Sequence, residues 1–198
     1  KQRKIDNIVI QGYTNFPKSY IENYFDISDN TVYSSKTLLD VETKLNSLNF
    51  VKPTKKPEVL FKPDSTVLYL GLKKENNNSI DGLINFATQE NGKFLVTGNV
   101  DLRLKNLLDY GEELSFFWNS AGNNRQELKI KTFLPYLFST KISPEINFEI
   151  YRQDSSFTNT RFSSKINYSF SSKFSLGASL NVESSTSTQN QLDLDSYS

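Results

Sequence analysis

The sequence predicts a chain of two parts, a small α+β domain of β-α-α-β-β order followed by an antiparallel sheet of about seven amphipathic strands. Three observations support this prediction. Residues 1–78 hold two segments with helical spacing between short strand-like runs, residues 79–183 alternate apolar and polar side chains, and a short polar linker at residues 73–78 lies between the two patterns. We therefore place the two domains at residues 1–78 and 79–198.

The small domain is expected to open with a short isoleucine-rich strand at residues 5–10 that stops at Gly12. Pro17 can begin a helix, because the N–H that proline lacks would be unpaired at this position anyway. Residues 20–25 then place tyrosine, isoleucine and phenylalanine at helical spacing. A first helix is therefore predicted after Pro17.

A second helix is expected after Ser34 or Ser35, either of which can cap its N-terminus. Its apolar residues recur at positions i, i+3, i+7 and i+10 and are Leu38, Val41, Leu45 and Leu48. Two alternating runs then flank a Pro-Asp-Ser turn at residues 63–65, which predicts the last two strands. We expect the apolar side of this helix to pack against the sheet.

The second part alternates with a period of two, which places successive side chains on opposite faces of a strand. From Phe94 to Lys105 the even positions are apolar or glycine, and the odd positions are mostly polar. Similar alternation occurs at residues 80–88, 114–119, 127–136, 145–150, 161–170 and 174–183. Strands of about 8–11 residues suit a transmembrane barrel as well as a soluble sheet. In a barrel, we expect the even positions to face lipid and the odd positions to face the lumen.

The charged and aromatic residues do not distinguish a transmembrane barrel from a soluble sheet. The odd positions carry charges of both signs, which suits pairing inside a wet lumen or exposure on a soluble sheet. Aromatic residues gather near strand ends, as in the girdles of membrane barrels, although strands are rich in aromatics in any case. At the end nearer the small domain they are Tyr110, Tyr136, Phe138, Phe170 and Phe174, and at the far end Phe86, Trp118, Tyr151 and Phe157.

The amino-acid composition limits the catalytic and metal-binding sites that the chain can form. The 198 residues include no cysteine, histidine or methionine, and the net charge is +1. A disulfide, a thiolate or imidazole catalyst and a zinc–sulfur site are therefore excluded, and nothing favours nucleic acid as a partner. No apolar run approaches the roughly 18 residues of a membrane helix. Because the sequence contains no methionine, we expect that the chain begins internally. The segment Asp193-Leu194-Asp195 is more typical of a solvated loop than of a calcium site. We expect no cofactor, no metal and no enzymatic activity.

Several short motifs follow one another in the order known from one protein family. In the first part they are Gly12, Asn49-Phe50-Val51 at the expected end of the second helix, and Val59-Leu60-Phe61. In the second part they are Asn106 with Gly111-Glu112, Leu134-Pro135-Tyr136-Leu137-Phe138, and Tyr151-Arg152-Gln153-Asp154 with Ser155-Ser156-Phe157. Pro135 also fits a place where the pairing of a strand stops.

Together these motifs resemble the BamA/TamA superfamily, the outer-membrane-protein-85 or bacterial surface antigen family, and in particular its Bacteroidota-like members. The resemblance implies an α+β POTRA domain in the periplasm, followed by an antiparallel transmembrane β-barrel in the bacterial outer membrane. Seven antiparallel strands cannot close such a barrel without leaving an edge, so the chain is expected to be the front portion of a longer protein. The resemblance implies a role in insertion or assembly of outer-membrane proteins.

The chemistry that this resemblance implies is strand exchange at two sheet edges. One candidate is the gate strand at residues 80–88, with Ile80, Gly82, Ile84 and Phe86 on one face, although an ordinary lipid-facing strand would look the same. The other is the POTRA edge formed by Glu58, Val59, Leu60 and Phe61, where packing of Val59 and Phe61 in the core is the more frequent explanation. Implied partners are nascent outer-membrane proteins, outer-membrane lipid, and accessory lipoproteins or periplasmic proteins.

Two other functions remain open. A two-partner-secretion-type export pore would keep the architecture but transport a single substrate, although such pores usually carry two POTRA domains and a plug helix. A soluble β-rich periplasmic or surface binding module would need no membrane at all.

Overall fold

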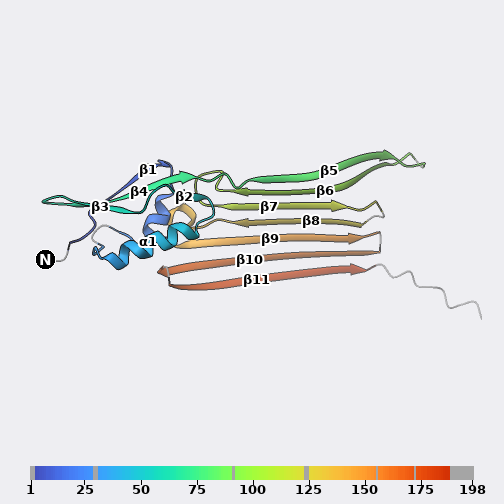
Figure 1. Cartoon of the computed structure of the whole chain (residues 1–198). Helices are drawn as coiled ribbons and strands as arrows, with labels where there is room; N and C mark the ends of the chain where they lie inside the picture. The colour runs from blue at the N-terminus through green and yellow to red at the C-terminus, as the bar shows by residue number, and fades with distance from the viewer. Residues whose placement is uncertain are drawn as a thin grey trace, which may run out of the picture.

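The computed structural model describes residues 3–28, 31–90, 92–122, 125–154, 156–171 and 173–187. Its strands form two sheets, one of four strands and one of seven (Figure 1). The four-stranded sheet and the helices lie at one end of the long strands, which we call the near end, and the opposite end is the far end. No helix in the described part of the chain is long and apolar enough to cross a membrane.

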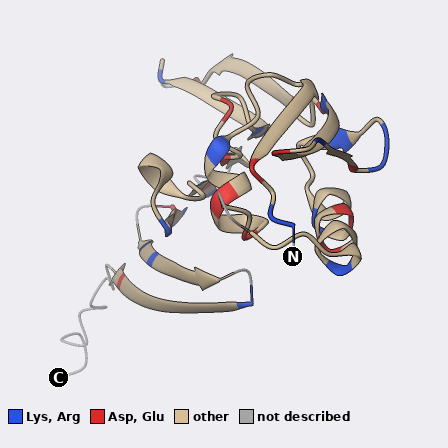
Figure 2. Ribbon diagram, turned by 90° about the vertical axis from the view of Figure 1, so that its left-hand side faces the viewer, with Lys and Arg blue, Asp and Glu red and all other residues tan. Residues whose placement is uncertain are grey.

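The small sheet is organised around β4 (Thr66–Lys74), most of which is buried. β1 (Asn7–Gly12) pairs with β4 in parallel on one side. β3 (Glu58–Phe61) and β2 (Val51–Pro53) pair with it antiparallel, one after the other, on the opposite side. Charged residues of both signs are interspersed over this domain rather than separated by sign (Figure 2).

The helix α1 (Ser35–Ser47) supplies much of the core of the small domain. Its N-terminus is capped by Ser34, whose hydroxyl accepts a hydrogen bond from the N–H of Thr37 at 3.0 Å. Val41 and Leu45 are each only 1% exposed, and Leu38 and Leu48 pack partly buried against the same core. The predicted apolar helix face therefore lies where we expected it.

The small domain differs from the predicted β-α-α-β-β order in its details. The first helix is the five-residue π-helix η1 (Tyr20–Tyr24). α1 ends at Ser47, so the segment 49–51 lies beyond the helix, and Val51 begins the additional strand β2. A three-residue strand shows no periodicity, and its Pro53 cannot donate to the ladder, which explains why the pattern missed it. β4 runs to Lys74, so residues 75–78 are left to connect the two sheets.

The second sheet confirms the prediction of seven antiparallel strands. Each strand pairs with its neighbours in sequence, in the order β11-β10-β9-β8-β7-β6-β5, and the described sheet is open. The strands are β5 (Ser79–Thr88), β6 (Phe94–Lys105), β7 (Glu113–Ser120), β8 (Arg125–Phe133), β9 (Ile142–Gln153), β10 (Phe157–Ser171) and β11 (Phe174–Ser187). β10 and β11 are longer than predicted, and β8 stops before Leu134 and Tyr136, which lie in the following turn.

The register keeps even residues opposite even residues throughout this sheet, apart from an irregularity where β10 turns into β11. One row across β6–β10 consists of Leu102, Phe116, Ile130, Phe148 and Phe162. Because successive side chains alternate between faces, the even residues share one face and the odd residues share the other.

Candidate functional site: two sheet edges and the junction between the sheets

The two faces of the seven-stranded sheet differ in chemistry. The even face exposes large apolar side chains, with Ile80 78%, Phe86 66% and Leu176 64% exposed. On the odd face, charges pair between neighbouring strands, in the ion pairs Lys105–Glu113 at 3.6 Å, Lys131–Glu145 at 3.2 Å, Arg161–Glu149 at 3.5 Å and Arg161–Glu183 at 3.1 Å. An exposed apolar face of this extent marks contact with a partner or a membrane.

The predicted gate strand is β5, which is exposed along its whole length and pairs only with β6 among the described residues. Its Gly82 is opposite Val100, and a Cβ at Gly82 would lie 2.5 Å from the carbonyl oxygen of Asn99. Gly98 on β6 has a φ of +132°, and a Cβ there would run into the carbonyl oxygen of Leu83. The glycines therefore permit a close approach of the two backbones, while the other edge of β5 stays unpaired.

The predicted POTRA edge is β3, which pairs only with β4 among the described residues. Val59 is partly buried and packs against the core. The ring of Phe61 lies 5.0 Å from that of Tyr33, and Leu60 is 45% exposed. Val59 thus packs against the core as expected, whereas Phe61 is 48% exposed and contacts Tyr33 outside the core. The backbone of β3 offers a free edge.

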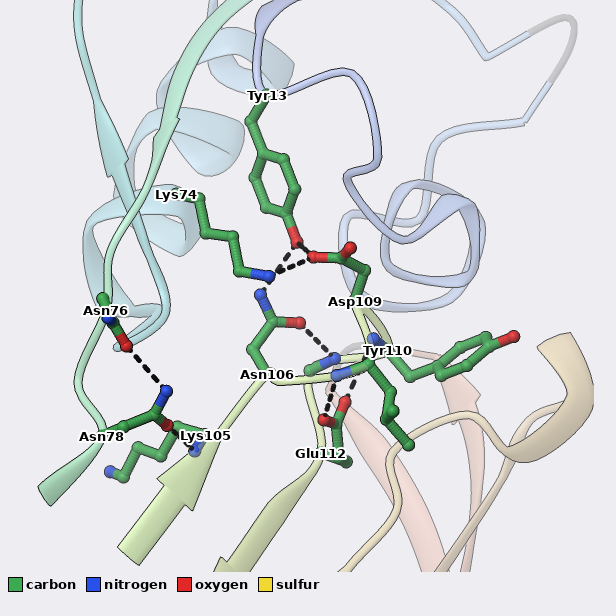
Figure 3. A network of polar contacts seen from close by, with 11 residues as sticks. Tyr13, Lys74, Asn76, Asn78, Lys105, Asn106, Asp109, Tyr110 and Glu112 are labelled. Carbon is green, nitrogen blue, oxygen red and sulfur yellow. Dashed lines mark hydrogen bonds and ion pairs between the residues drawn. The ribbon is translucent and has the colours of Figure 1, made fainter. Parts of the chain in front are cut away.

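A loop between β6 and β7, residues 106–112, joins the two sheets (Figure 3). The side-chain carbonyl of Asn106 accepts from the N–H of Gly111 at 2.8 Å, and its amide donates to the Tyr13 hydroxyl at 2.8 Å. The Glu112 carboxylate accepts from the N–H groups of Leu108 at 2.6 Å and Tyr110 at 3.1 Å. The loop is therefore held in shape by its own side chains while it contacts the small domain.

Asp109 of this loop forms the charged part of the contact. Its carboxylate accepts from the Tyr13 hydroxyl and pairs with Lys74 at 2.5 Å. Partial burial opposes ionisation, but hydrogen bonds from Lys74 and Tyr13 outweigh it and lower the pKa of Asp109 below its ordinary value of 3.8. Burial, helped by the bond to Asp109, raises the pKa of Tyr13, so the phenol stays protonated and donates.

A second contact between the two sheets is aromatic. The rings of Tyr20 on η1 and Tyr136 in the β8–β9 turn meet edge to face with centroids 5.2 Å apart. A Cβ at Gly111 would lie 2.5 Å from the ring of Tyr20, so the loop approaches this ring as closely as glycine allows. Burial raises the pKa of Tyr136 to about 12, and both phenols remain neutral at physiological pH.

The motif residues Asn106, Gly111 and Tyr136 thus meet the small domain at this junction, and the neighbouring Pro135 is buried in the turn. Tyr136 was expected in the near-end aromatic girdle, but it is only 9% exposed because Tyr20 covers it. Tyr13, Lys74 and Asp109 were not predicted, since no short-range pattern connects residues so far apart in sequence.

Replacing Tyr13 with phenylalanine should destabilise the junction by about 1–3 kcal/mol, because the buried amide of Asn106 loses its acceptor. Hydrogen exchange of residues 106–112 would measure the loss. Tyr110→Phe is the matched control, since Tyr110 lies in the same loop and is 63% exposed. Similar exchange in the two variants would contradict a role of the Tyr13 hydroxyl in the junction.

The junction should also weaken in acid. A carboxylate whose pKa is lowered by folding contributes stability that is fully present above its unfolded-state pKa and is lost as the pH falls through the folded-state value. For Asp109 this window lies below its ordinary value of 3.8. The exchange rates of the loop should therefore rise in this range, and Asp109→Asn should remove that part of the pH dependence. An unchanged profile in the variant would contradict this assignment.

The described residues contain no group of three or more histidines, cysteines, aspartates or glutamates placed to hold a metal ion. The Asp193-Leu194-Asp195 segment lies outside the described residues.

No protein-family model matches the sequence, and no match is found among the curated proteins. Among solved structures, the chain is similar to BamA from Haemophilus ducreyi lacking POTRA domains 1–3, with a TM-score of 0.61 and 14% identity over 93% of this chain and 36% of that one. It is also similar to CdiB from Acinetobacter baumannii, with a TM-score of 0.58 and 16% identity over 96% of this chain and 39% of that one. The chain thus spans well under half of these two structures, and at these identities the similarity shows a shared fold.

Proposed function

We propose that the chain is part of an outer-membrane barrel protein of the BamA/TamA type that inserts or assembles other outer-membrane proteins. In this proposal, residues 1–78 form a periplasmic POTRA domain and the seven-stranded sheet is the first portion of the barrel. The observation that carries the proposal is the division of this sheet into an exposed apolar face and an ion-paired polar face, in a fold similar to that of BamA and CdiB.

In this proposal, a client strand pairs with the free edge of β5. Unpaired backbone N–H and C=O groups are costly in lipid, so this edge requires a partner strand. A client strand can provide it through main-chain hydrogen bonds, as in other cases of strand addition. The free edge of β3 offers the same kind of pairing outside the membrane. The bonds described at residues 106–112 hold the small domain against the end of the sheet, which places the two edges in a fixed relation.

An export pore is the second candidate, and it is kept because the similarity to CdiB is comparable to the similarity to BamA. It has the same architecture but requires no strand exchange at β5. A soluble binding module is less well supported, because nothing in the described part of the chain covers the apolar even face.

A photo-crosslinker placed along β5 separates the candidates. At Leu83 or Asn85 it should capture incoming outer-membrane proteins during their assembly, because these residues lie on the strand with the free edge. Asn119 on the interior strand β7, paired on both sides, is the matched control and should capture none. Assembly that proceeds without any adduct at β5 would contradict the gate and favour the export pore.

A further inference from the structure

The even face of the seven-stranded sheet carries one charged side chain among the strand residues that the structure describes, and this is Arg152. It follows a row of apolar residues on β9 and lies at the far end of that strand. Five cations of the odd face lie within ion-pair distance of carboxylates, namely Arg103, Lys105, Lys129, Lys131 and Arg161. No such pair is found for Arg152 within the described ranges, and its Nε donates to the backbone carbonyl of Asp154 at 3.2 Å.

Arg152 borders a groove of about 420 Å³ on the sheet. Gln126 on β8 and Thr158 on β10 are its direct cross-strand partners, so a polar row crosses the groove at the far end. The next even row toward the near end is apolar and consists of Trp118, Leu128 and Ile150. The groove is therefore amphipathic along the strand direction, with a cation and hydrogen-bonding groups at one end and an apolar floor at the other.

Glu127 also lines the groove, but its carboxylate pairs with Lys129 at 2.7 Å. As an odd residue it belongs to the opposite face of the sheet. Its negative charge is therefore offset by its own partner, and the guanidinium of Arg152 is the charge that an anion on the even face would meet.

The position of Arg152 along β9 matches the edge of a membrane. The even residues from Ile142 to Ile150 cover about 27 Å along the strand at roughly 3.4 Å per residue. At a barrel-strand tilt of roughly 40° this becomes about 21 Å across a membrane, close to the apolar band of outer-membrane barrels. Arg152 then lies just beyond the hydrocarbon, at the level of lipid headgroups, where a cation is tolerated.

We propose that this groove binds a phosphate-bearing anionic lipid, with its phosphate at Arg152 and an acyl chain along Trp118, Leu128 and Ile150. Gln126 and Thr158 add hydrogen bonds to the headgroup, and a guanidinium suits phosphate because it can donate two parallel hydrogen bonds. This inference rests on the proposed membrane location of the sheet. It adds a lipid site on the outer surface, which strand exchange at β5 does not require.

Trp118 is the single tryptophan of the chain, so its fluorescence can be used to detect a lipid in this groove. The full chain in phosphatidylcholine vesicles is mixed with lipids brominated on an acyl chain, which quench tryptophan on contact. Brominated phosphatidic acid should reach half-quenching at about a fivefold lower mole fraction than brominated phosphatidylcholine, the ratio expected for one cation at an anionic headgroup. Arg152→Gln should abolish this preference, and Arg152→Lys should keep most of it.

Arg125→Gln is the matched control, because Arg125 lies at the far end of the neighbouring strand β8 but on the odd face. It removes the same charge and should leave the preference intact. Equal quenching by both lipids in the parent chain, or an equal loss in the two glutamine variants, would overturn the lipid site while leaving the membrane location in place. Absence of quenching by either lipid would overturn the membrane location as well.

Discussion

Replacing Leu45 with alanine should lower the free energy of unfolding of the small domain by about 2–5 kcal/mol. Leu45 lies on α1, is 1% exposed, and belongs to the core formed with Leu68, Leu70 and Leu72 of β4. Truncation removes buried methyl groups and leaves a cavity that the surrounding side chains fill only in part. Hydrogen exchange of α1 and β4 amides at increasing denaturant would measure the loss.

Leu39→Ala is the matched control, because it makes the same truncation on the same helix at a residue that is 61% exposed. Its effect should stay near zero, since little apolar area is removed from contact. Equal losses in the two variants, or rapid exchange throughout residues 38–48 of the parent chain, would show that this helix face is not the core.

The seven-stranded sheet could be predicted because its pattern is long and regular. The alternation recurs in every segment and is longest from Phe94 to Lys105, and a slip of one residue would exchange the two faces of a strand. The turns were less predictable. Tyr136 continues the alternation of β8, but the chain has already left the strand at Leu134, where Pro135 and the ring of Tyr20 determine its position.

The small domain could be predicted in outline, because the apolar spacing of α1 identifies both the helix and its buried face. The shortest elements of this domain could not be predicted from the sequence. β2 exists because Val51–Pro53 pairs with the end of β4, which is a tertiary contact rather than a local preference. The bonds of Tyr13 and Lys74 to Asp109 likewise join residues distant in sequence, so only the folded chain brings them together.

Replacing Val100 with arginine should cost about 2–4 kcal/mol of stability in a bilayer, if the even face meets lipid as proposed. Val100 lies at the middle of β6, opposite Gly82 and Trp118, so its side chain would lie near the membrane midplane. A guanidinium there must either lose its hydration or pull water into the hydrocarbon. Among the described strand residues, no carboxylate lies on this face to pair with it. Urea unfolding of the full chain in vesicles would measure the cost.

Asn99→Arg is the matched control, because it introduces the same side chain one residue earlier, on the odd face that already carries charges. Its cost should be small, since a wet polar face hydrates the guanidinium. The absence of native cysteine allows a second measurement, in which single cysteines at positions 100 and 101 are labelled with a water-soluble reagent. Position 101 should react much faster than position 100, because only the odd face is in contact with water. Equal labelling, or equal costs for the two arginines, would contradict the barrel and indicate a sheet with water on both faces.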